Sequence, residues 1–413
     1  MSEVATREPQ LRFPEFSDSL IKGALGDYAL IKRGAGSQYI EYSKDSKDSI
    51  RLIRIGDFLG GDAVFVRLTN AIQRFLLDEG DILIAGTGAT AGITFLVPTK
   101  FVGMAYSYNA PKIKVHKDNV SFFYQYLISP KIKIQQIRLF TGNAQPFLDT
   151  NAIKGFSIFK PPLQEQQKIA AFLAAVDSKI EQLSKKQALL GEYKKGLMQQ
   201  IFSQAIRFKA NDGSDFPDWE EKKLGDLSVV ISDGNYGELY PTSSDFKLTG
   251  VPFLRANNIK SLKIDGTDTK YITEEQHSLL TSGHLQTNDI LITTRGVLGN
   301  LAIVESTHNG SNINAQICLL RVTNTSELNH FYLLFVLDHR DSKKQYKAFE
   351  TGTALKQLPK GNLRKIKLKL PTLFEQNKIA NFLSSIDTKI EQVDKQLDES
   401  KQFKKALLQQ MFV

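Results

Sequence analysis

The apolar residues of this chain are most regularly spaced in two segments, one near its middle and one at its end. In each segment they recur at alternating intervals of three and four residues for five heptads. The first segment has the two series Ile169, Val176, Leu183, Leu190, Leu197 and Leu173, Ile180, Gln187, Lys194, Ile201. The second has Ile379, Ile386, Val393, Ser400, Leu407 and Leu383, Ile390, Leu397, Lys404, Met411. A three-four spacing sustained over this length predicts a coiled-coil seam.

Two long helices with equivalent seams would most simply pack on each other as an antiparallel pair within one chain. Pro162 and Pro371 stand just before the two segments, where proline is tolerated or marks a helix boundary. Two alternatives remain open: each helix could belong to the core of its own domain, or the seams could dimerise between chains. The polar seam residues Gln187, Lys194, Ser400 and Lys404 are expected to fix the register.

The chain also repeats itself. Residues 161–202 and 371–412 align at a constant shift of 210 positions, and 21 of the 42 aligned residues are identical. The match extends more faintly upstream, where Asp81-Ile-Leu-Ile corresponds to Asp289-Ile-Leu-Ile. Such self-similarity indicates an internal duplication. The strongly diverged blocks before each helix are free to vary between the two copies, whereas the helices are held to a common role.

The blocks themselves have the alternation of short β-rich runs, turns and helical stretches that predicts a mixed fold. The clearest strands are expected at 81–85, 289–293 and 317–322, and the clearest helices at 121–128 and 328–338. A strand is also expected from Arg364, with Lys365, Lys367 and Lys369 on one face. Such a lysine row indicates a solvated or edge face more often than a phosphate-contacting one.

These patterns predict an α+β fold with two globular mixed α/β domains, each followed by a long helix, the two helices pairing as an antiparallel coiled coil in an internal pseudo-two-fold duplication. The predicted boundaries are 1–160 and 208–370 for the domains, with 161–207 and 371–413 for the helices.

Composition narrows the function only a little. The net charge of +9 is compatible with a nucleic-acid partner and does not require one. Cys318 is the single cysteine, so neither a disulfide framework nor a cysteine-based metal cluster is expected. The polar N-terminus and the lack of a long apolar run favour a cytoplasmic protein.

Catalytic motifs are absent from the sequence. The segment that begins with Gly86-Thr-Gly-Ala-Thr-Ala imitates a dinucleotide fingerprint, but the acidic residue expected about 20 positions later is missing, which favours a tight turn near DNA. No Walker motif, H-E-x-x-H metal motif or metal-spaced histidine cluster is present. We therefore expect a chain that is not an enzyme and holds no metal or cofactor.

The loops of both blocks are rich in residue types that read DNA. Arginine pairs with guanine and asparagine or glutamine with adenine through two hydrogen bonds, and glycine lets backbone approach phosphate. From loop position and side-chain chemistry, the expected DNA contacts in the first block are Arg54, Thr87, Tyr108, Asn109 and Gln145. In the second block they are Asn235, Tyr236, Arg255, Asn257, Arg295, Asn314 and Lys356.

The repeated helical motif E-Q-x-K-I-A-x-F-L-x-x-x-D-x-K-I-E-Q, which begins at Glu165 and at Glu375, resembles that of the specificity subunits of type I restriction-modification enzymes. The resemblance covers essentially the whole chain. The loop from Ser232 to Pro241 is also similar to a D-G-x-H-x-x-P loop of that family, with Tyr236 in place of the usual histidine.

The resemblance implies that each block is a target-recognition domain for one half of a bipartite, asymmetric DNA site. It implies that the helices set the gap between the half-sites and dock two adenine-N6 methyltransferase subunits, through which two restriction/translocase subunits join. S-adenosylmethionine, ATP and magnesium would belong to those partners. The docking residues expected from the repeated motif are Gln166, Lys168, Phe172, Gln376, Lys378 and Phe382.

Two other classes of function remain as alternatives. A stand-alone DNA-binding protein could use the same domains without methyltransferase partners. An enzyme, such as a fused nuclease or methyltransferase, is disfavoured by the missing catalytic motifs.

Overall fold

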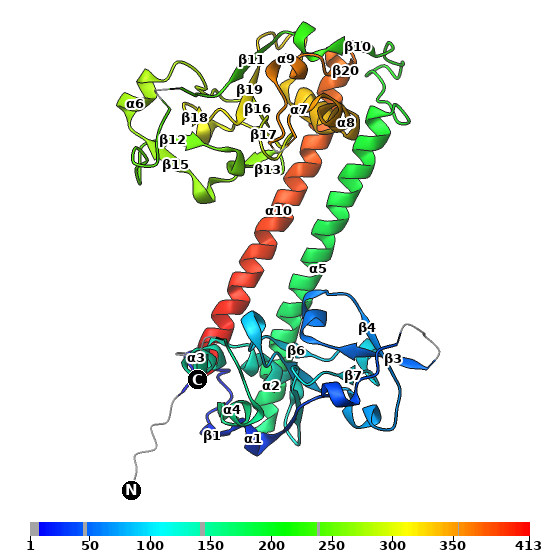
Figure 1. Cartoon of the computed structure of the whole chain (residues 1–413), viewed down its shortest axis with the longest axis vertical. Helices are drawn as coiled ribbons and strands as arrows, with labels where there is room; N and C mark the ends of the chain where they lie inside the picture. The colour runs from blue at the N-terminus through cyan, green and yellow to red at the C-terminus, as the bar shows by residue number, and fades with distance from the viewer. Residues whose placement is uncertain (1–7, 44–47, 141–144, 238–239, 354) are drawn as a thin grey trace. The chain divides into compact units, whose positions relative to one another are not determined.

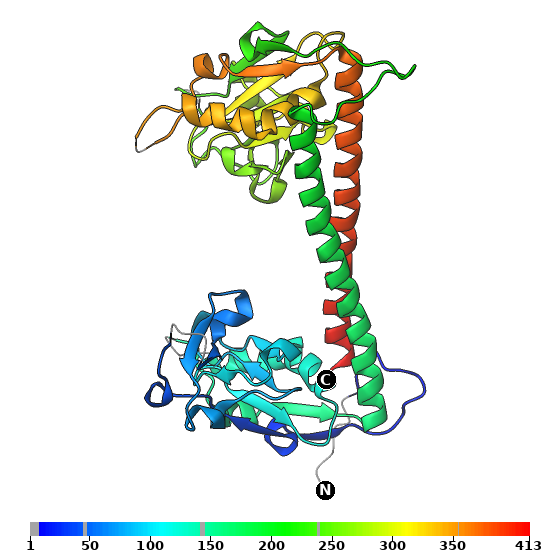
Figure 2. The same ribbon diagram turned by 90° about the vertical axis from the view of Figure 1, so that its right-hand side faces the viewer.

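The computed structural model describes residues 8–43, 48–140, 145–237, 240–353 and 355–413. The chain divides into two compact units (Figures 1 and 2). Unit 1 comprises Met1–Lys185 and Asp394–Val413, and unit 2 comprises Lys186–Val393. Each unit therefore contains one domain of sheets and short helices together with part of both long helices, α5 (Leu163–Phe202) and α10 (Leu373–Met411).

The domain of unit 1 is built from short elements. Its helices are α1 (Leu25–Tyr28), α2 (Val120–Leu127), α3 (Pro130–Phe140) and α4 (Thr150–Lys154). Its strands are β1 (Ile21–Ala24), β2 (Ala29–Lys32), β3 (Ser49–Ile53), β4 (Val64–Arg67), β5 (Ile82–Ile84), β6 (Thr94–Leu96), β7 (Ala105–Tyr106), β8 (Lys112–Val115) and β9 (Ser157–Lys160).

The domain of unit 2 has a closely similar set of elements. Its helices are α6 (Glu274–Leu279), α7 (His330–Asp338), α8 (Arg340–Phe349) and α9 (Lys360–Leu363). Its strands are β10 (Glu220–Lys223), β11 (Val229–Asp233), β12 (Val251–Leu254), β13 (Ile259–Lys260), β14 (Lys263–Ile264), β15 (Lys270–Ile272), β16 (Ile290–Thr293), β17 (Leu301–Ile303), β18 (Asn312–Ile313), β19 (Ile317–Val322) and β20 (Lys367–Leu370).

The two domains share one sheet topology. A four-stranded antiparallel sheet has the order β2-β8-β5-β6 in unit 1 and β11-β19-β16-β17 in unit 2. A three-stranded sheet follows as β4-β3-β7 and β15-β12-β18, and in both cases the pairing with its third strand is parallel. A two-stranded ribbon, β1-β9 or β10-β20, leads into the long helix. The duplication expected from the helices is thus confirmed in the diverged domains.

The antiparallel coiled coil is also confirmed, and it forms within the chain. In unit 1 the first part of α5 packs beside the last part of α10, so that Ile169 and Leu173 share a core with Leu407 and Met411 (Figure 2). In unit 2 the last part of α5 packs beside the first part of α10, where Ile201 joins a second core. All twenty predicted seam residues are buried or partly buried.

Two of the predicted polar seam residues form ion pairs at corresponding places. Lys194 contacts Asp387 at 2.6 Å in unit 2, and Lys404 contacts Asp177 at 2.5 Å in unit 1. Residue 194 corresponds to 404 and residue 177 to 387 in the repeat, so one pair is built twice with its partners exchanged between the helices. Because a buried charge requires its partner, these pairs disfavour other registers of the seam.

A buried glutamine fastens each long helix to its domain. Gln376 accepts a hydrogen bond from the backbone N–H of Asn329 at 2.9 Å and donates to the carbonyl of Pro371 at 3.0 Å. The Asn329 side chain in turn caps α7 by accepting from the N–H of Tyr332. In unit 1, Gln166 makes the same contacts with Asn119, the cap of α2, and with Pro161.

The predicted strand from Arg364 is shorter than expected. The strand β20 begins at Lys367, because α9 and the turn after it take up the preceding residues and place Lys365 outside the ladder. Lys367 and Lys369 do alternate with buried leucines, and Lys367 pairs with Glu221 on the neighbouring strand at 2.8 Å. This arrangement supports the solvated-face interpretation.

Among the described residues, no helix combines the length and the apolar character needed to cross a membrane.

We expect Gln376→Leu to lower the free energy of unfolding by about 2 kcal/mol, because the Asn329 N–H and the Pro371 carbonyl lose their partner in a buried place. Urea denaturation would measure the change. Gln392→Leu, on the exposed face of the same helix, is the matched control and should change stability by less than about 0.5 kcal/mol. Equal effects of the two substitutions would contradict the fastening role.

We expect Lys194→Met alone to destabilise the protein by about 1–3 kcal/mol, because the partly buried Asp387 loses its counter-ion. Burial raises the pKa of Asp387, and Lys194 offsets part of that rise. The deficit relative to the parent protein should therefore shrink as pH falls toward the pKa of Asp387, because the carboxyl then becomes neutral. The double variant Lys194→Met/Asp387→Leu should be close to the parent in stability, and an equally unstable double variant would count against this account.

Candidate nucleic-acid interface

In each domain a glycine loop lies directly against the turn that follows the short parallel strand. In unit 1 the Ala35 N–H donates to the Tyr106 carbonyl at 2.8 Å, and a Cβ on Gly34 would lie only 2.2 Å from that oxygen. In unit 2 a Cβ on Gly234 would lie 2.1 Å from the Asn314 carbonyl. Glycine is required at both places because two backbones meet there. The loops thus converge in the same way in the two domains.

A second convergence brings in the segment that imitates a dinucleotide fingerprint. The Gly86 N–H donates to the Asn109 carbonyl at 2.9 Å, and Thr87 forms an isolated antiparallel bridge with Phe147. Gly88 begins a short 3-10 turn, η4 (Gly88–Thr90), and not the long helix of a phosphate-binding fold. The interpretation of this segment as a tight turn therefore agrees with its geometry.

Arg54 and Arg255 occupy equivalent positions. Each immediately precedes a 3-10 turn, η2 (Ile55–Leu59) or η7 (Ala256–Asn258), and its backbone N–H is bound by the side chain three residues later at 2.9 Å. The guanidinium of Arg54 donates to the Asp62 carbonyl at 3.1 Å, and that of Arg255 to the Asp268 carbonyl at 3.0 Å. Both Nε atoms are buried without a hydrogen-bond partner among the described residues. The two arginines are therefore held in the same way, by one hydrogen bond at the backbone N–H and one from the guanidinium to a backbone carbonyl.

The unit 1 loops enclose a groove of about 760 Å³, which brings together Arg54, Tyr108 and Asn109 of the predicted contacts. Gln38 and the exposed Tyr42 also line it, and neither was among the predicted contacts. Thr87 lies next to this groove, because the N–H of its neighbour Gly86 donates to the carbonyl of Asn109. Gln145 is exposed and lies two residues before Phe147, the bridge partner of Thr87.

Sequence reasoning also missed a stack of side chains at the edge of this groove. The Arg33 guanidinium lies 4.4 Å from the ring centre of Tyr108 and 5.3 Å from that of Phe147. Both rings remain about half exposed. Only the folded chain brings these three residues together, since Arg33 and Phe147 are distant in sequence. A cation held between exposed aromatic rings suits contact with bases and with phosphate.

In unit 2 two of the predicted contacts are committed to the loop framework. Asn235 is buried, and its amide donates to the Ser282 carbonyl while accepting from the Ser282 N–H. Asn314 is buried as well and bonds to the backbone and side chain of Gln316. Their side chains therefore shape the loops and do not present a free hydrogen-bonding edge as they lie here.

The other predicted residues of unit 2 are more accessible. Tyr236 is 68% exposed, and Arg295 is exposed where it bridges Gln357, just before the turn that begins at Gly296. Asn257 donates to the Asp268 carboxylate, which also pairs with Arg255 at 2.6 Å.

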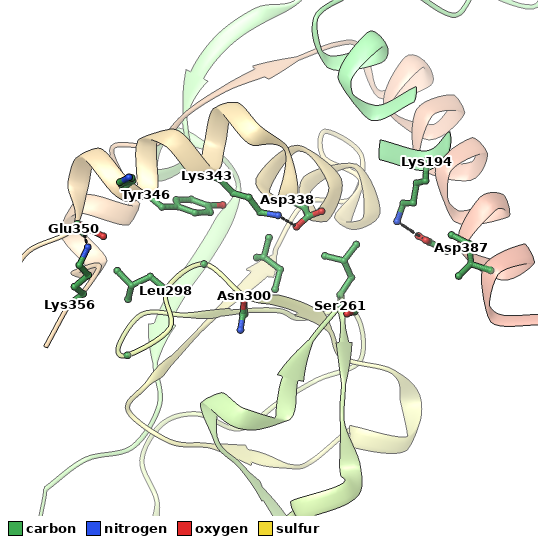
Figure 3. Close-up of a pocket in the computed structure, with 16 residues that line it drawn as sticks. Lys194, Ser261, Leu298, Asn300, Asp338, Lys343, Tyr346, Glu350, Lys356 and Asp387 are labelled. Atoms are coloured by element: carbon green, nitrogen blue, oxygen red, sulfur yellow. Dashed lines mark hydrogen bonds and ion pairs between the residues drawn. The ribbon is translucent and has the colours of Figure 1, made fainter. Parts of the chain in front are cut away.

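Lys356 lies at the rim of a pocket of about 840 Å³ in unit 2 (Figure 3). Its ammonium pairs with Glu350 at 2.5 Å, and two further lysines of the pocket pair likewise, Lys343 with Asp338 and Lys194 with Asp387. Because each of these three lysines has a carboxylate beside it, the pocket offers an anion little net attraction. The inside of this pocket is therefore less suited to a polyanion than the loops and the rim at which Lys356 lies.

The residues expected to dock partners contact their own unit. Gln166 and Gln376 are buried, so their side chains are not accessible as they lie here. Lys168 pairs with Glu15, and the Lys378 ammonium donates to the Lys209 carbonyl at 2.7 Å.

The two phenylalanines of the docking set behave alike. Phe172 stacks edge-on with Phe13 at 5.8 Å, and Phe382 with Phe208 at 5.6 Å. A different pair of aromatic residues, Tyr193 and Phe403, was not predicted from the sequence to be exposed, although the two residues correspond in the repeat. They are 55% and 53% exposed, and their positions outside the heptad seam could have indicated this exposure.

No group of three His, Cys, Asp or Glu side chains that could hold a metal ion is found in the described part of the chain. What the site offers is arginine, amide, hydroxyl and aromatic side chains on tightly bonded loops. These side-chain types are the ones that proteins use to contact phosphate and base edges.

Comparison with known proteins identifies this architecture. The family described as "Type I restriction modification DNA specificity domain" matches residues 24–190 and 217–400. The specificity subunit of the type I restriction enzyme MjaVIII from Methanocaldococcus jannaschii is 26% identical over 353 residues, which cover 83% of this chain and 80% of that protein. The EcoBI specificity subunit from Escherichia coli is 21% identical over 406 residues, covering 93% and 82%.

Solved structures agree on the fold. The type I restriction-modification S subunit from M. genitalium superposes with a TM-score of 0.62 at 17% identity, covering 98% of this chain and 99% of that one. A chain from a study of complex assembly and conformational transition in a type I R-M system gives 0.56 at 20% identity, covering 94% and 96%. The repeated helices, the duplicated domains and the family match together show that this chain belongs to the specificity subunits of type I restriction-modification systems, the non-catalytic subunits that recognise DNA.

Proposed function

We propose that this chain recognises an asymmetric, bipartite DNA site, with residues 1–160 contacting one half-site and residues 208–370 the other. The observation that carries the proposal is the loop framework built twice with different side chains. Gly34 and Gly234 make the same close approach, and Arg54 and Arg255 are held in the same way. A shared framework binds the same kind of ligand, and different side chains on it select different bases.

The contacts proposed for the first half-site are Arg54, Thr87, Tyr108, Asn109 and Gln145. For the second they are Tyr236, Arg255, Asn257, Arg295 and Lys356, with Asn235 and Asn314 acting through the shape of their loops. The separation into direct contacts and loop-shaping residues is supported by the loops themselves, whose tips carry exposed polar side chains while their backbone is fixed by hydrogen bonds. Rigid loops lose little conformational freedom on binding, which favours discrimination between bases.

We further propose that the long helices carry two adenine-N6 methyltransferase subunits, and through them two restriction/translocase subunits. Exposed residues of a helix need not match for the helix to fold. Yet Lys179, Gln182 and Lys195 are exposed and identical to Lys389, Gln392 and Lys405. An identical surface presented twice suits two copies of one partner. S-adenosylmethionine, ATP and magnesium would be bound by those partners.

The residues of the repeated motif enter this docking proposal in two ways. Lys168, Phe172, Lys378 and Phe382 remain partly accessible and stay candidates for direct contact. Gln166 and Gln376 would act indirectly, by holding each helix to its domain.

Co-expression with a type I methyltransferase subunit of the same host, followed by mapping of methylated adenines across the host genome, tests the proposal. We expect one asymmetric motif of two short half-sites with a fixed gap and a methylated adenine in each half. A chain that fails to bind the methyltransferase would contradict the docking proposal and favour a stand-alone DNA-binding protein. A stable complex that methylates no adenine would indicate an inactive specificity subunit.

The helices are also proposed to set the gap between the half-sites. Inserting four residues, about one helical turn, after Gln187 in α5 and after Asp394 in α10 should lengthen the gap by roughly one or two base pairs and leave both half-sites unchanged. The methylated motif of the variant measures this directly. An unchanged gap would show that the helices are not the ruler.

A further inference from the structure

The bridge formed by Thr87 and Phe147 in unit 1 has an equivalent in unit 2, formed by Arg295 and Gln357. The hydrogen bonds around the two bridges correspond one by one. The Gly86 N–H donates to the Asn109 carbonyl at 2.9 Å, and the Thr294 N–H donates to the Gln316 carbonyl at 2.8 Å.

The other side of each bridge corresponds equally well. The Leu148 N–H donates to the Gly86 carbonyl at 2.8 Å, and the Leu358 N–H to the Thr294 carbonyl at 2.8 Å. Thr87 is followed by Gly88 with a φ of 75°, and Arg295 is followed by Gly296 with a φ of 78°. Positive φ at both sites gives the two turns the same left-handed step. The two bridges are thus one backbone structure that carries two different pairs of side chains.

The side-chain chemistry of the two pairs differs. Unit 1 presents the threonine hydroxyl and methyl with an exposed aromatic ring, which Arg33 covers in part. Unit 2 presents a guanidinium with an amide.

Arg295 is exposed, and neither an ion pair nor a hydrogen bond of its guanidinium occurs among the described residues. In the same unit Arg255 is held by Asp268 and Arg321 by Asp289. An arginine left without an acidic partner on rigid backbone keeps all five of its donors available to a ligand.

We propose that this bridge is the position where the two domains select different bases, and that Arg295, which is paired with Gln357 through the backbone, recognises a guanine of the second half-site. The inference rests on the DNA recognition proposed above. A guanidinium matches the O6 and N7 acceptors of guanine with two parallel hydrogen bonds. The equivalent Thr87 and Phe147 suit the methyl group of thymine, since both offer apolar surface to the major groove.

The test uses the complex with the methyltransferase and a set of duplexes that carry each of the four base pairs at every position of the second half-site. The variant is Arg295→Gln. For the parent complex we expect one position where a G·C pair is preferred by about 10- to 100-fold. Arg295→Gln should remove that preference and leave the first half-site unchanged. The double variant Arg295→Thr/Gln357→Phe, which transfers the unit 1 pair, should also lose the preference for guanine.

Arg340→Gln is the matched control, because Arg340 is an exposed arginine of the same unit on α8, away from the loops. It should retain the preference at every position. A loss of affinity in Arg295→Gln that is equal for all four base pairs, with a shallower salt dependence, would show a phosphate contact and overturn the inference. An unchanged preference would overturn it as well, with DNA recognition intact. A parent complex that distinguishes no duplex would instead overturn the proposed function.

Discussion

The antiparallel pairing of α5 and α10 is the constraint on which the rest of the structure depends, because it places the end of each helix in the core of the unit formed by the other repeat. Phe202, which ends the helix that follows the first domain, packs against Trp219 and Tyr332 of the second. Phe412, which directly follows α10, packs against Phe122 and Tyr126 of the first domain. Neither domain closes its apolar core with residues of its own repeat alone. The seam thus holds the helices together and also completes both domains.

The loops are also built alike in both units, because the same backbone contacts fix them while their exposed side chains differ. The close approaches at Gly34 and Gly234 and the bonds from the backbone N–H groups of Arg54 and Arg255 to buried side chains use only backbone and buried groups. Side chains at the exposed tips of the loops can then differ between the two domains and leave the fold intact. This separation explains how the domains diverged strongly in sequence while their strand orders stayed the same.

Much of the architecture could be predicted from the sequence because its signals are periodic. The heptad seam, the duplication and the strands at 289–293 and 317–322 follow from spacing and from residue type. The site was harder to predict, because exposure depends on contacts between distant segments. Asn235 and Asn314 have the chemistry of base readers but are buried in their loops, and Arg33 joins Tyr108 only in the fold. The burial of Gln166 and Gln376 could not be predicted for the same reason, because a helix motif alone does not show which polar side chains the neighbouring domain covers.

The division of the chain between the units has a consequence for how the protein is made. Unit 2 is continuous in sequence, from Lys186 to Val393, so its core can close as soon as that stretch has left the ribosome. Unit 1 begins earlier but requires residues 394–413, where the Val413 carbonyl accepts a hydrogen bond from Tyr126 across a separation of 287 positions. The domain that is synthesised first is therefore completed last. During translation the apolar face of unit 1 therefore remains uncovered until α10 has been synthesised.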